Sequence, residues 1–151
     1  MRNNEKEIPR HQPPKGSKTQ NQELLYDPNV LTPSHAEQAQ TLVSKMATAT
    51  LCTMSIEPAG YPYGSFVTYA IYEGNPIFLI SGLAEHTKNL DKDSKASLLI
   101  AEAGEGNPLA LGRVTLMGDC KRLPEEHREN VRDIFLSKNP DSKFYIDFKD
   151  F

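Results

Sequence analysis

The segment Ser81–Asn89, with sequence SGLAEHTKN, gathers hydroxyl, imidazole, ammonium and amide groups directly after the apolar run Ile77–Ile80. This order of residues predicts a strand that ends in a polar turn, followed by the start of a short helix. Backbone N–H groups at a helix start, with polar donors beside them, suit a phosphate. The segment therefore predicts a phosphate site and, with it, a nucleotide-like cofactor.

Each polar residue of this segment also has a simpler interpretation. His86 can donate a hydrogen bond to a phosphate, or it can be an exposed histidine at a helix start. Thr87 and Asn89 can bind the phosphate or cap the helix, and Ser81 belongs to the same turn. None of the histidines and cysteines has the spacing of a zinc site, so the sequence predicts no metal centre.

Two more polar residues lie in strand-like runs and are candidates for ligand contact. Ser65 follows Gly64, which either brings the backbone close to a ligand or relieves crowding in a twisted strand. Arg113 can bind a phosphate with both guanidinium nitrogens, or pair with a carboxylate of a neighbouring subunit. The alternatives stay open for both residues at this stage.

The elements that position these residues alternate between helical and strand periodicity. Ser34 and Glu37 have the spacing of a capping box, and the residues after them repeat at helical spacing. A second long helix is expected from Pro124 to the residue before Pro140, and Phe144–Phe148 favours helix over strand. Five strands are expected between the helices, at Thr50–Ile56, Tyr63–Tyr72, Pro76–Ile80, Ala96–Ala101 and Leu111–Leu123.

This arrangement predicts a mainly β domain with flanking helices, built as a small barrel or a strongly coiled sheet. The chain of 151 residues is long enough for one domain with a core, which we expect over residues 34–151. Residues 1–33 are polar and interrupted by prolines, which predicts a disordered N-terminal arm. A net charge of −3 excludes a strongly basic nucleic-acid-binding protein, and the absence of long apolar runs predicts a cytoplasmic protein without membrane spans.

Three strings carry a resemblance to a known family: GYPYGSFVTYA, IFLISGLAEHTKNL and SLLIAEAGEGNPLALGRVTLMGDCKRL. Together they resemble the pyridoxamine 5′-phosphate oxidase-like flavin-binding split barrels, and most closely the branch of the heme-utilisation proteins and their plastid relatives. The resemblance implies a six-stranded split β-barrel that forms a homodimer with FMN in the clefts between subunits. Because the sequence offers five strands, we expect the last barrel strand to be missing.

The resemblance also implies which residues contact the cofactor. The phosphate of FMN would be held by Ser65 and by the turn with Ser81, His86, Thr87 and Asn89. The flavin ring would lie along the backbone of Val67 and Thr68, and Arg113 would reach the cofactor from the fifth strand. The oxidase itself has arginine and lysine where this chain has Ser65, Glu85 and His86, so oxidation of pyridoxamine phosphate is not implied.

Three functions follow from the sequence and the resemblance, with catalytic residues and substrate left unknown. The first is an FMN-dependent oxidoreductase that acts as a homodimer. The second is binding or breakdown of heme on the same fold, for which an axial ligand such as histidine is required. The third is a non-catalytic regulatory protein of tetrapyrrole metabolism.

Overall fold

A computed structural model describes residues 33–105 and 107–150 of the chain. The predicted N-terminal arm lies outside these described residues, except for Pro33. All further structural statements concern the described ranges.

The main sheet has four antiparallel strands in the order β2-β1-β5-β6. A second sheet of two short antiparallel strands, β3 and β4, continues from the end of β2. The strands are β1 (Thr48–Met54), β2 (Pro62–Thr68), β3 (Ala70–Tyr72), β4 (Asn75–Ile77), β5 (Lys95–Ala101) and β6 (Arg113–Asp119). The prediction of a mainly β fold with flanking helices is confirmed, and the strands of the described region do not close into a barrel.

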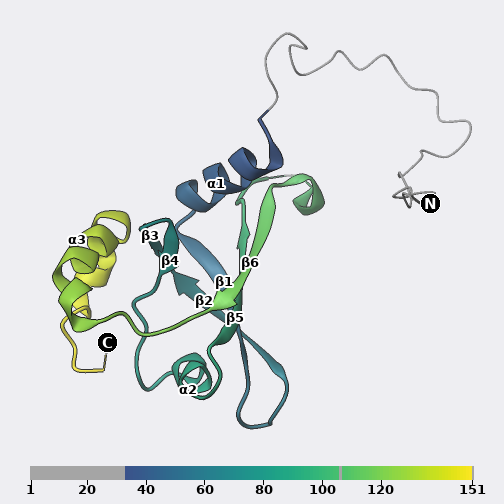
Figure 1. Cartoon of the computed structure of the whole chain (residues 1–151). Helices are drawn as coiled ribbons and strands as arrows, with labels where there is room; N and C mark the ends of the chain where they lie inside the picture. Colours follow the sequence, from purple (N-terminus) through teal and green to yellow (C-terminus); the bar gives the residue numbers. More distant parts are fainter. Residues whose placement is uncertain (1–32, 106, 151) are drawn as a thin grey trace, which may run out of the picture. The chain divides into compact units, whose positions relative to one another are not determined.

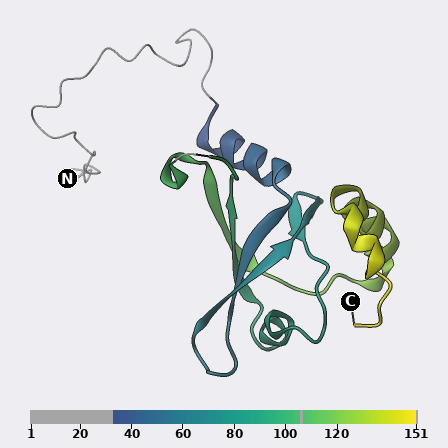
Figure 2. The ribbon, with the colours of Figure 1, turned by 180° about the vertical axis from the view of Figure 1, so that it is seen from behind.

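Three α-helices flank the strands, together with three short 3₁₀ helices. Figures 1 and 2 show α1 and α2 at opposite ends of the main sheet, with α3 beside β3 and β4. The helices are α1 (His35–Lys45), α2 (Glu85–Lys92), α3 (Arg128–Lys138), η1 (Pro108–Ala110), η2 (Glu125–His127) and η3 (Pro140–Phe144). The predicted capping box is present at the start of α1, where Ser34 and Glu37 bond each other reciprocally.

The main sheet has one buried face and one exposed face, which follows from the alternation of side chains along each strand. On the buried face, Leu51 of β1 and Ile100 of β5 are 1% and 0% exposed, respectively. Apolar side chains of α1, of α2 and of the segment between β4 and α2 cover this face. Burial of this face is the main stabilising contribution to the domain.

Tyr69 divides the predicted strand Tyr63–Tyr72 into β2 and β3. Its ring belongs to the core of the main sheet, whereas the next residue, Ala70, packs in a second core with Phe135 of α3. Two consecutive buried residues cannot lie on one face of one strand, so the chain changes sheets here. The Tyr69 carbonyl accepts a hydrogen bond from Asn139 Nδ2 at 3.1 Å, and the Tyr69 hydroxyl donates to the Val43 carbonyl at 2.7 Å.

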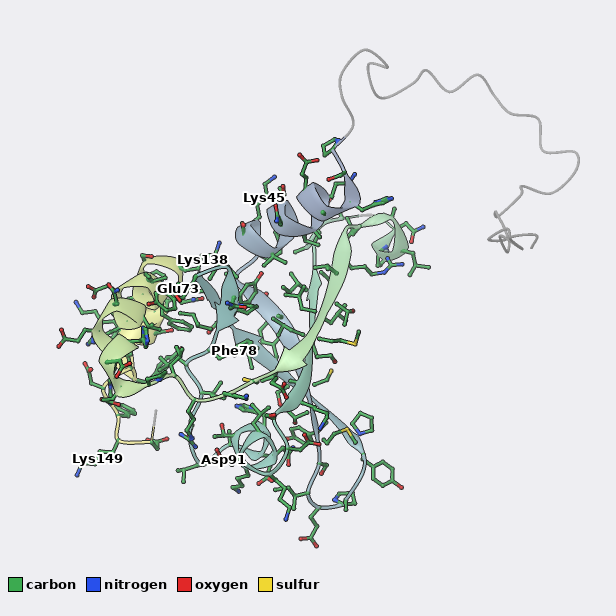
Figure 3. The ribbon with its side chains drawn as sticks, viewed as in Figure 1. Lys45, Glu73, Phe78, Asp91, Lys138 and Lys149 are labelled. Carbon is green, nitrogen blue, oxygen red and sulfur yellow. The ribbon has the colours of Figure 1, made fainter. Side chains whose placement is uncertain are left out.

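The end of α3 also contacts the end of α1. Lys138 Nζ donates to the carbonyls of Ser44 and Lys45, at 2.7 and 3.2 Å, respectively. Figure 3 shows Lys138 close to Lys45 at the C-terminal end of α1. A lysine at this position stabilises a helix end, because the last carbonyls have no partners within the helix.

Several other predicted elements differ from the structure. The first strand, predicted at Thr50–Ile56, is β1 (Thr48–Met54), and the third, predicted at Pro76–Ile80, is β4 (Asn75–Ile77). The fifth predicted strand, Leu111–Leu123, is observed as β6 over Arg113–Asp119, which matches the length of β5. One backbone hydrogen bond extends the pairing on each side, from the Glu102 N–H to Gly112 and from the Cys120 N–H to Ser94.

The segment Phe144–Phe148 is neither α-helix nor strand: Phe144 ends the 3₁₀ helix η3, and residues 145–148 form turns and a bend. Ile146 is buried, whereas Phe144 and Phe148 remain exposed, so the two phenylalanines do not form a buried face.

Candidate functional site

The predicted phosphate turn lies between β4 and α2, and its hydroxyl groups bond within the chain. Ser81 Oγ accepts a hydrogen bond from the Leu83 N–H at 3.1 Å. Thr87 is buried, and its hydroxyl donates to the Ser81 carbonyl at 2.6 Å. Ala84 precedes α2 and provides no side-chain cap. Thr87 therefore stabilises the turn from inside, with its hydroxyl proton already donated.

Asn89 connects α2 to β1 in the interior of the domain. Its side chain is 1% exposed, and Nδ2 donates to the hydroxyl oxygen of the buried Thr53 at 3.0 Å. Its Oδ1 accepts the N–H of Ile56 at 3.1 Å. Both ends of the amide are thus bonded to the protein, which is the arrangement of a structural residue.

His86 and Ser65 are brought together by the packing of α2 against β2. His86 Nδ1 lies 3.1 Å from Ser65 Oγ. His86 Nε2 is buried and has no hydrogen-bond partner. Desolvation lowers the pKa of His86, which favours the neutral imidazole. Ser65 and His86, to which the resemblance assigns contacts with the phosphate, are therefore neighbours.

Asp150 binds to the same turn from a distant part of the sequence. Its carboxylate Oδ2 accepts a hydrogen bond from Ser81 Oγ at 2.6 Å, and its main-chain carbonyl accepts the Gly82 N–H at 2.5 Å. A carboxylate oxygen therefore lies at the turn where the sequence predicts a phosphate oxygen. Sequence reasoning missed Asp150, because no local pattern connects residues 69 positions apart.

The remaining predicted residues lie apart from this turn. The side chain of Val67 is in the core at 6% exposure, and Thr68 ends β2 opposite Thr48. Arg113 begins β6 opposite Ala101, at the end of the sheet beside α1 (Figure 1). Arg113 donates from its guanidinium to the Leu109 carbonyl at 3.2 Å. The cofactor-binding roles of all these residues stay predictions.

Arg113 lines a groove of about 490 Å³ between α1 and the start of β6. His35, the exposed first residue of α1, and Lys45, near its last turn, provide an imidazole and a second cation. The groove also contains Glu102, whose carboxylate accepts the Gly112 N–H at 3.2 Å. Apolar walls come from Ala39, Leu42, Met46 and Val114. No sequence pattern predicted the groove, since it needs α1 to cross the end of the sheet.

The exposed face of the main sheet carries apolar side chains. A row across the four strands consists of Phe66, Thr50, Leu99 and Thr115, which face each other in register. Phe66 is 78% exposed, and Met117 in the neighbouring row is 85% exposed. Apolar side chains of this size on an exposed sheet face are typical of a surface that a partner covers.

Comparisons with known proteins connect the chain to proteins that are named for heme. A structure described as a heme binding protein from Mycobacterium smegmatis has a TM-score of 0.73 and 39% sequence identity, covering 81% of this chain and 50% of that one. HOZ, a chloroplastic heme oxygenase of Arabidopsis thaliana, is 39% identical over 119 residues, which are 78% of this chain and 36% of HOZ. HutZ, described as the heme storage protein of Vibrio cholerae, shares the fold with a TM-score of 0.61 at 18% identity, over 76% of this chain and 82% of HutZ.

These matches agree with a split-barrel-like fold, and this chain spans half or less of the first two relatives. Within the described residues, none of the helices is long and apolar enough to span a membrane. A family model described as "CREG, beta-barrel" matches residues 31–151, which is most of the sequence. The chain therefore belongs to the CREG β-barrel family.

Proposed function

We propose that this protein binds heme, and that the groove between α1 and β6 holds it. The observation that carries the proposal is the 39% identity to a heme binding protein over 81% of this chain. The chemistry of the groove supports its location. Heme is a flat apolar ring with two carboxylate groups and an iron that commonly takes histidine as an axial ligand.

The groove offers one group for each part of this ligand. Leu42, Val114 and their apolar neighbours suit the ring, while Lys45 and Arg113 suit the two carboxylates. The His35 side chain is exposed and lines the groove. A volume of about 490 Å³ lies within the usual range of small-molecule sites.

The other described histidines are less suited to bind iron. His86 has its Nδ1 near Ser65 and its Nε2 covered by protein atoms, so a ring of the size of heme has no approach. His127 Nδ1 lies 3.0 Å from the Tyr72 hydroxyl, and the two rings are in edge contact. We therefore assign the axial position to His35.

FMN is the weaker candidate, because its phosphate has few donors left at the predicted turn. Ser81, Thr87 and Asn89 each donate to protein atoms, and Asp150 adds a negative charge. Of the polar atoms of His86 and Ser65, the unpartnered His86 Nε2 is the one left to bind an anion at this place. This comparison of donors favours heme over flavin.

We further propose a homodimer that forms through the exposed face of the main sheet. Phe66, Leu99 and Met117 supply apolar surface on this face, and isologous pairing would bury the same residues of both copies. Arg113 lies on the same face, at its edge. A second copy would therefore cover Phe66, Leu99 and Met117 and lie next to Arg113.

The test is a titration of the full chain with hemin, followed by absorption spectroscopy. The proposal expects a shifted Soret band that saturates at one heme per chain, and no comparable saturation with FMN monitored by flavin fluorescence. A spectrum that remains that of free hemin, together with saturable binding of FMN, would contradict the proposal.

A second candidate, breakdown of the bound heme, is favoured by the 39% identity to HOZ. The experiment adds ascorbate to the heme complex in the presence of catalase, which removes free peroxide. Loss of the Soret band with release of iron, measured with a ferrous chelator, supports breakdown. A stable Soret band limits the function to binding.

A further inference from the structure

We propose that Asp150 occupies the oxyanion position of the turn Ser81–Leu83 and thereby makes this turn reject phosphate groups. The inference does not depend on heme binding, because the turn precedes α2 and the groove lies beside α1, and these two helices are at opposite ends of the sheet (Figures 1 and 2). It assigns a specificity-determining role to a residue that lies outside the predicted site.

Asp150 accepts hydrogen bonds from donors that a phosphate at this turn would need. The Ser81 hydroxyl has one proton, which it donates to the Asp150 carboxylate at 2.6 Å. This distance is typical of a charge-assisted O–H···O⁻ bond, about 2.5–2.7 Å. The Gly82 N–H donates to the Asp150 carbonyl at 2.5 Å. Two donors that face out of the turn are therefore already bonded.

The charge around the turn also disfavours a phosphate. Glu85 lies in the first turn of α2, where its carboxylate pairs with Lys88 Nζ at 2.6 Å. Lys88 is thus partly neutralised, and the Asp150 carboxylate adds a negative charge beside Ser81. A phosphate at this place would be repelled by a like charge.

Next to Asp150, the start of α2 still offers groups that could bind an anion. α2 has eight residues and no side-chain cap at Ala84, so its first N–H groups lack a side-chain acceptor. His86 Nε2 adds a buried nitrogen without a partner. Removing the carboxylate would therefore free the Ser81 hydroxyl for an oxyanion, while the Gly82 N–H stays bonded to the Asp150 main-chain carbonyl.

The experiment compares FMN with riboflavin, which differs from FMN only by the phosphate. The ratio of the two dissociation constants, riboflavin over FMN, reports the phosphate contribution and is measured by quenching of flavin fluorescence. We expect a ratio near one for the wild type, an intermediate ratio for Asp150→Asn, and about tenfold for Asp150→Ala, which corresponds to about 1.4 kcal/mol. Inorganic phosphate should compete with FMN in Asp150→Ala.

Asp147→Asn is the matched control. It removes the same charge from the same segment, but the Asp147 carboxylate pairs with Arg132 at 2.8 Å instead of the turn. Its ratio should equal that of the wild type. A wild-type ratio above ten, or an unchanged ratio in Asp150→Ala, would overturn the proposal.

A second measurement applies where flavins bind too weakly or a variant does not fold. The thermal midpoint of the wild type is compared in phosphate and in chloride at equal ionic strength, since a bound ligand raises the midpoint. Equal midpoints for the wild type support the proposal. A higher wild-type midpoint in phosphate that disappears in Ser81→Ala would refute it.

Discussion

Replacing Asn89 by alanine tests whether this residue serves the fold or a ligand. The change removes two hydrogen bonds, one to Thr53 Oγ1 at 3.0 Å and one from the Ile56 N–H at 3.1 Å. Thr53 is 2% exposed, so its hydroxyl loses a partner that water cannot replace. Ile56 is 44% exposed, and its N–H regains water in part.

The magnitude follows from these two environments. A buried polar group that loses its hydrogen-bond partner costs about 1–3 kcal/mol. We assign this full cost to the Thr53 hydroxyl and part of it to the Ile56 N–H, which is accessible to water. Alanine has a higher helix propensity than asparagine, which offsets about 0.5 kcal/mol of this loss of stability. The free energy of unfolding should therefore fall by about 2–3 kcal/mol. Thr53→Val removes the other partner, and the double variant should show a coupling of about 1 kcal/mol.

Urea denaturation followed by circular dichroism measures this effect as a lower midpoint with an unchanged slope. Lys92→Ala, an exposed change in the same helix, is the control and should stay within about 0.5 kcal/mol of the wild type. A loss of stability below about 1 kcal/mol for Asn89→Ala, with weakened FMN binding, would refute the structural role and favour a ligand contact.

Three further predictions concern other parts of the domain. Lys138→Met should lower the free energy of unfolding by about 1 kcal/mol in urea, because the last carbonyls of α1 lose their donor; an unchanged midpoint would contradict this. Phe66→Glu should convert the dimer to a monomer in light scattering, whereas Phe144→Glu, at a site of similar exposure away from the sheet, should not; equal masses would argue against the dimer face. Burial lowers the pKa of His86 below 6.5, so the unfolded chain binds more protons and stability should fall as the pH drops from about 6.5 through the lowered pKa. His86→Gln should flatten this dependence in thermal melts at several pH values, and an equally steep dependence would exclude His86 as its source.

Local sequence patterns predicted most of the elements, because each pattern has a direct physical cause. The reciprocal bonds of Ser34 and Glu37 need only residues three apart, so the start of α1 was predictable. The alternation predicted over Thr50–Ile56 overlaps β1 (Thr48–Met54), in which every second residue from Ala49 to Thr53 is buried. The Tyr63–Tyr72 run was predicted as one strand because β propensity does not show which core each residue joins.

Contacts between distant segments were not predictable in the same way. Asp150 binds Ser81 only because α3 and η3 return the chain to the turn, and Asn89 meets Thr53 only because α2 packs on β1. The polar types in the Ser81–Asn89 segment predicted hydrogen bonding correctly, but a type alone does not tell whether its partner is a ligand or the protein. The groove with His35 and Arg113 has the same origin, since its two walls come from α1 and from the residues around the start of β6, which are far apart in the sequence.

The most direct test of the heme proposal is a hemin titration of His35→Ala, Arg113→Ala and the control His127→Ala. The account predicts that His35→Ala loses the Soret position of the wild-type complex, and that Arg113→Ala weakens heme binding about tenfold through the loss of a charge-assisted bond. His127→Ala should keep both the spectrum and the affinity, because its imidazole bonds Tyr72. Wild-type spectra and affinities in His35→Ala and Arg113→Ala would contradict the proposed groove.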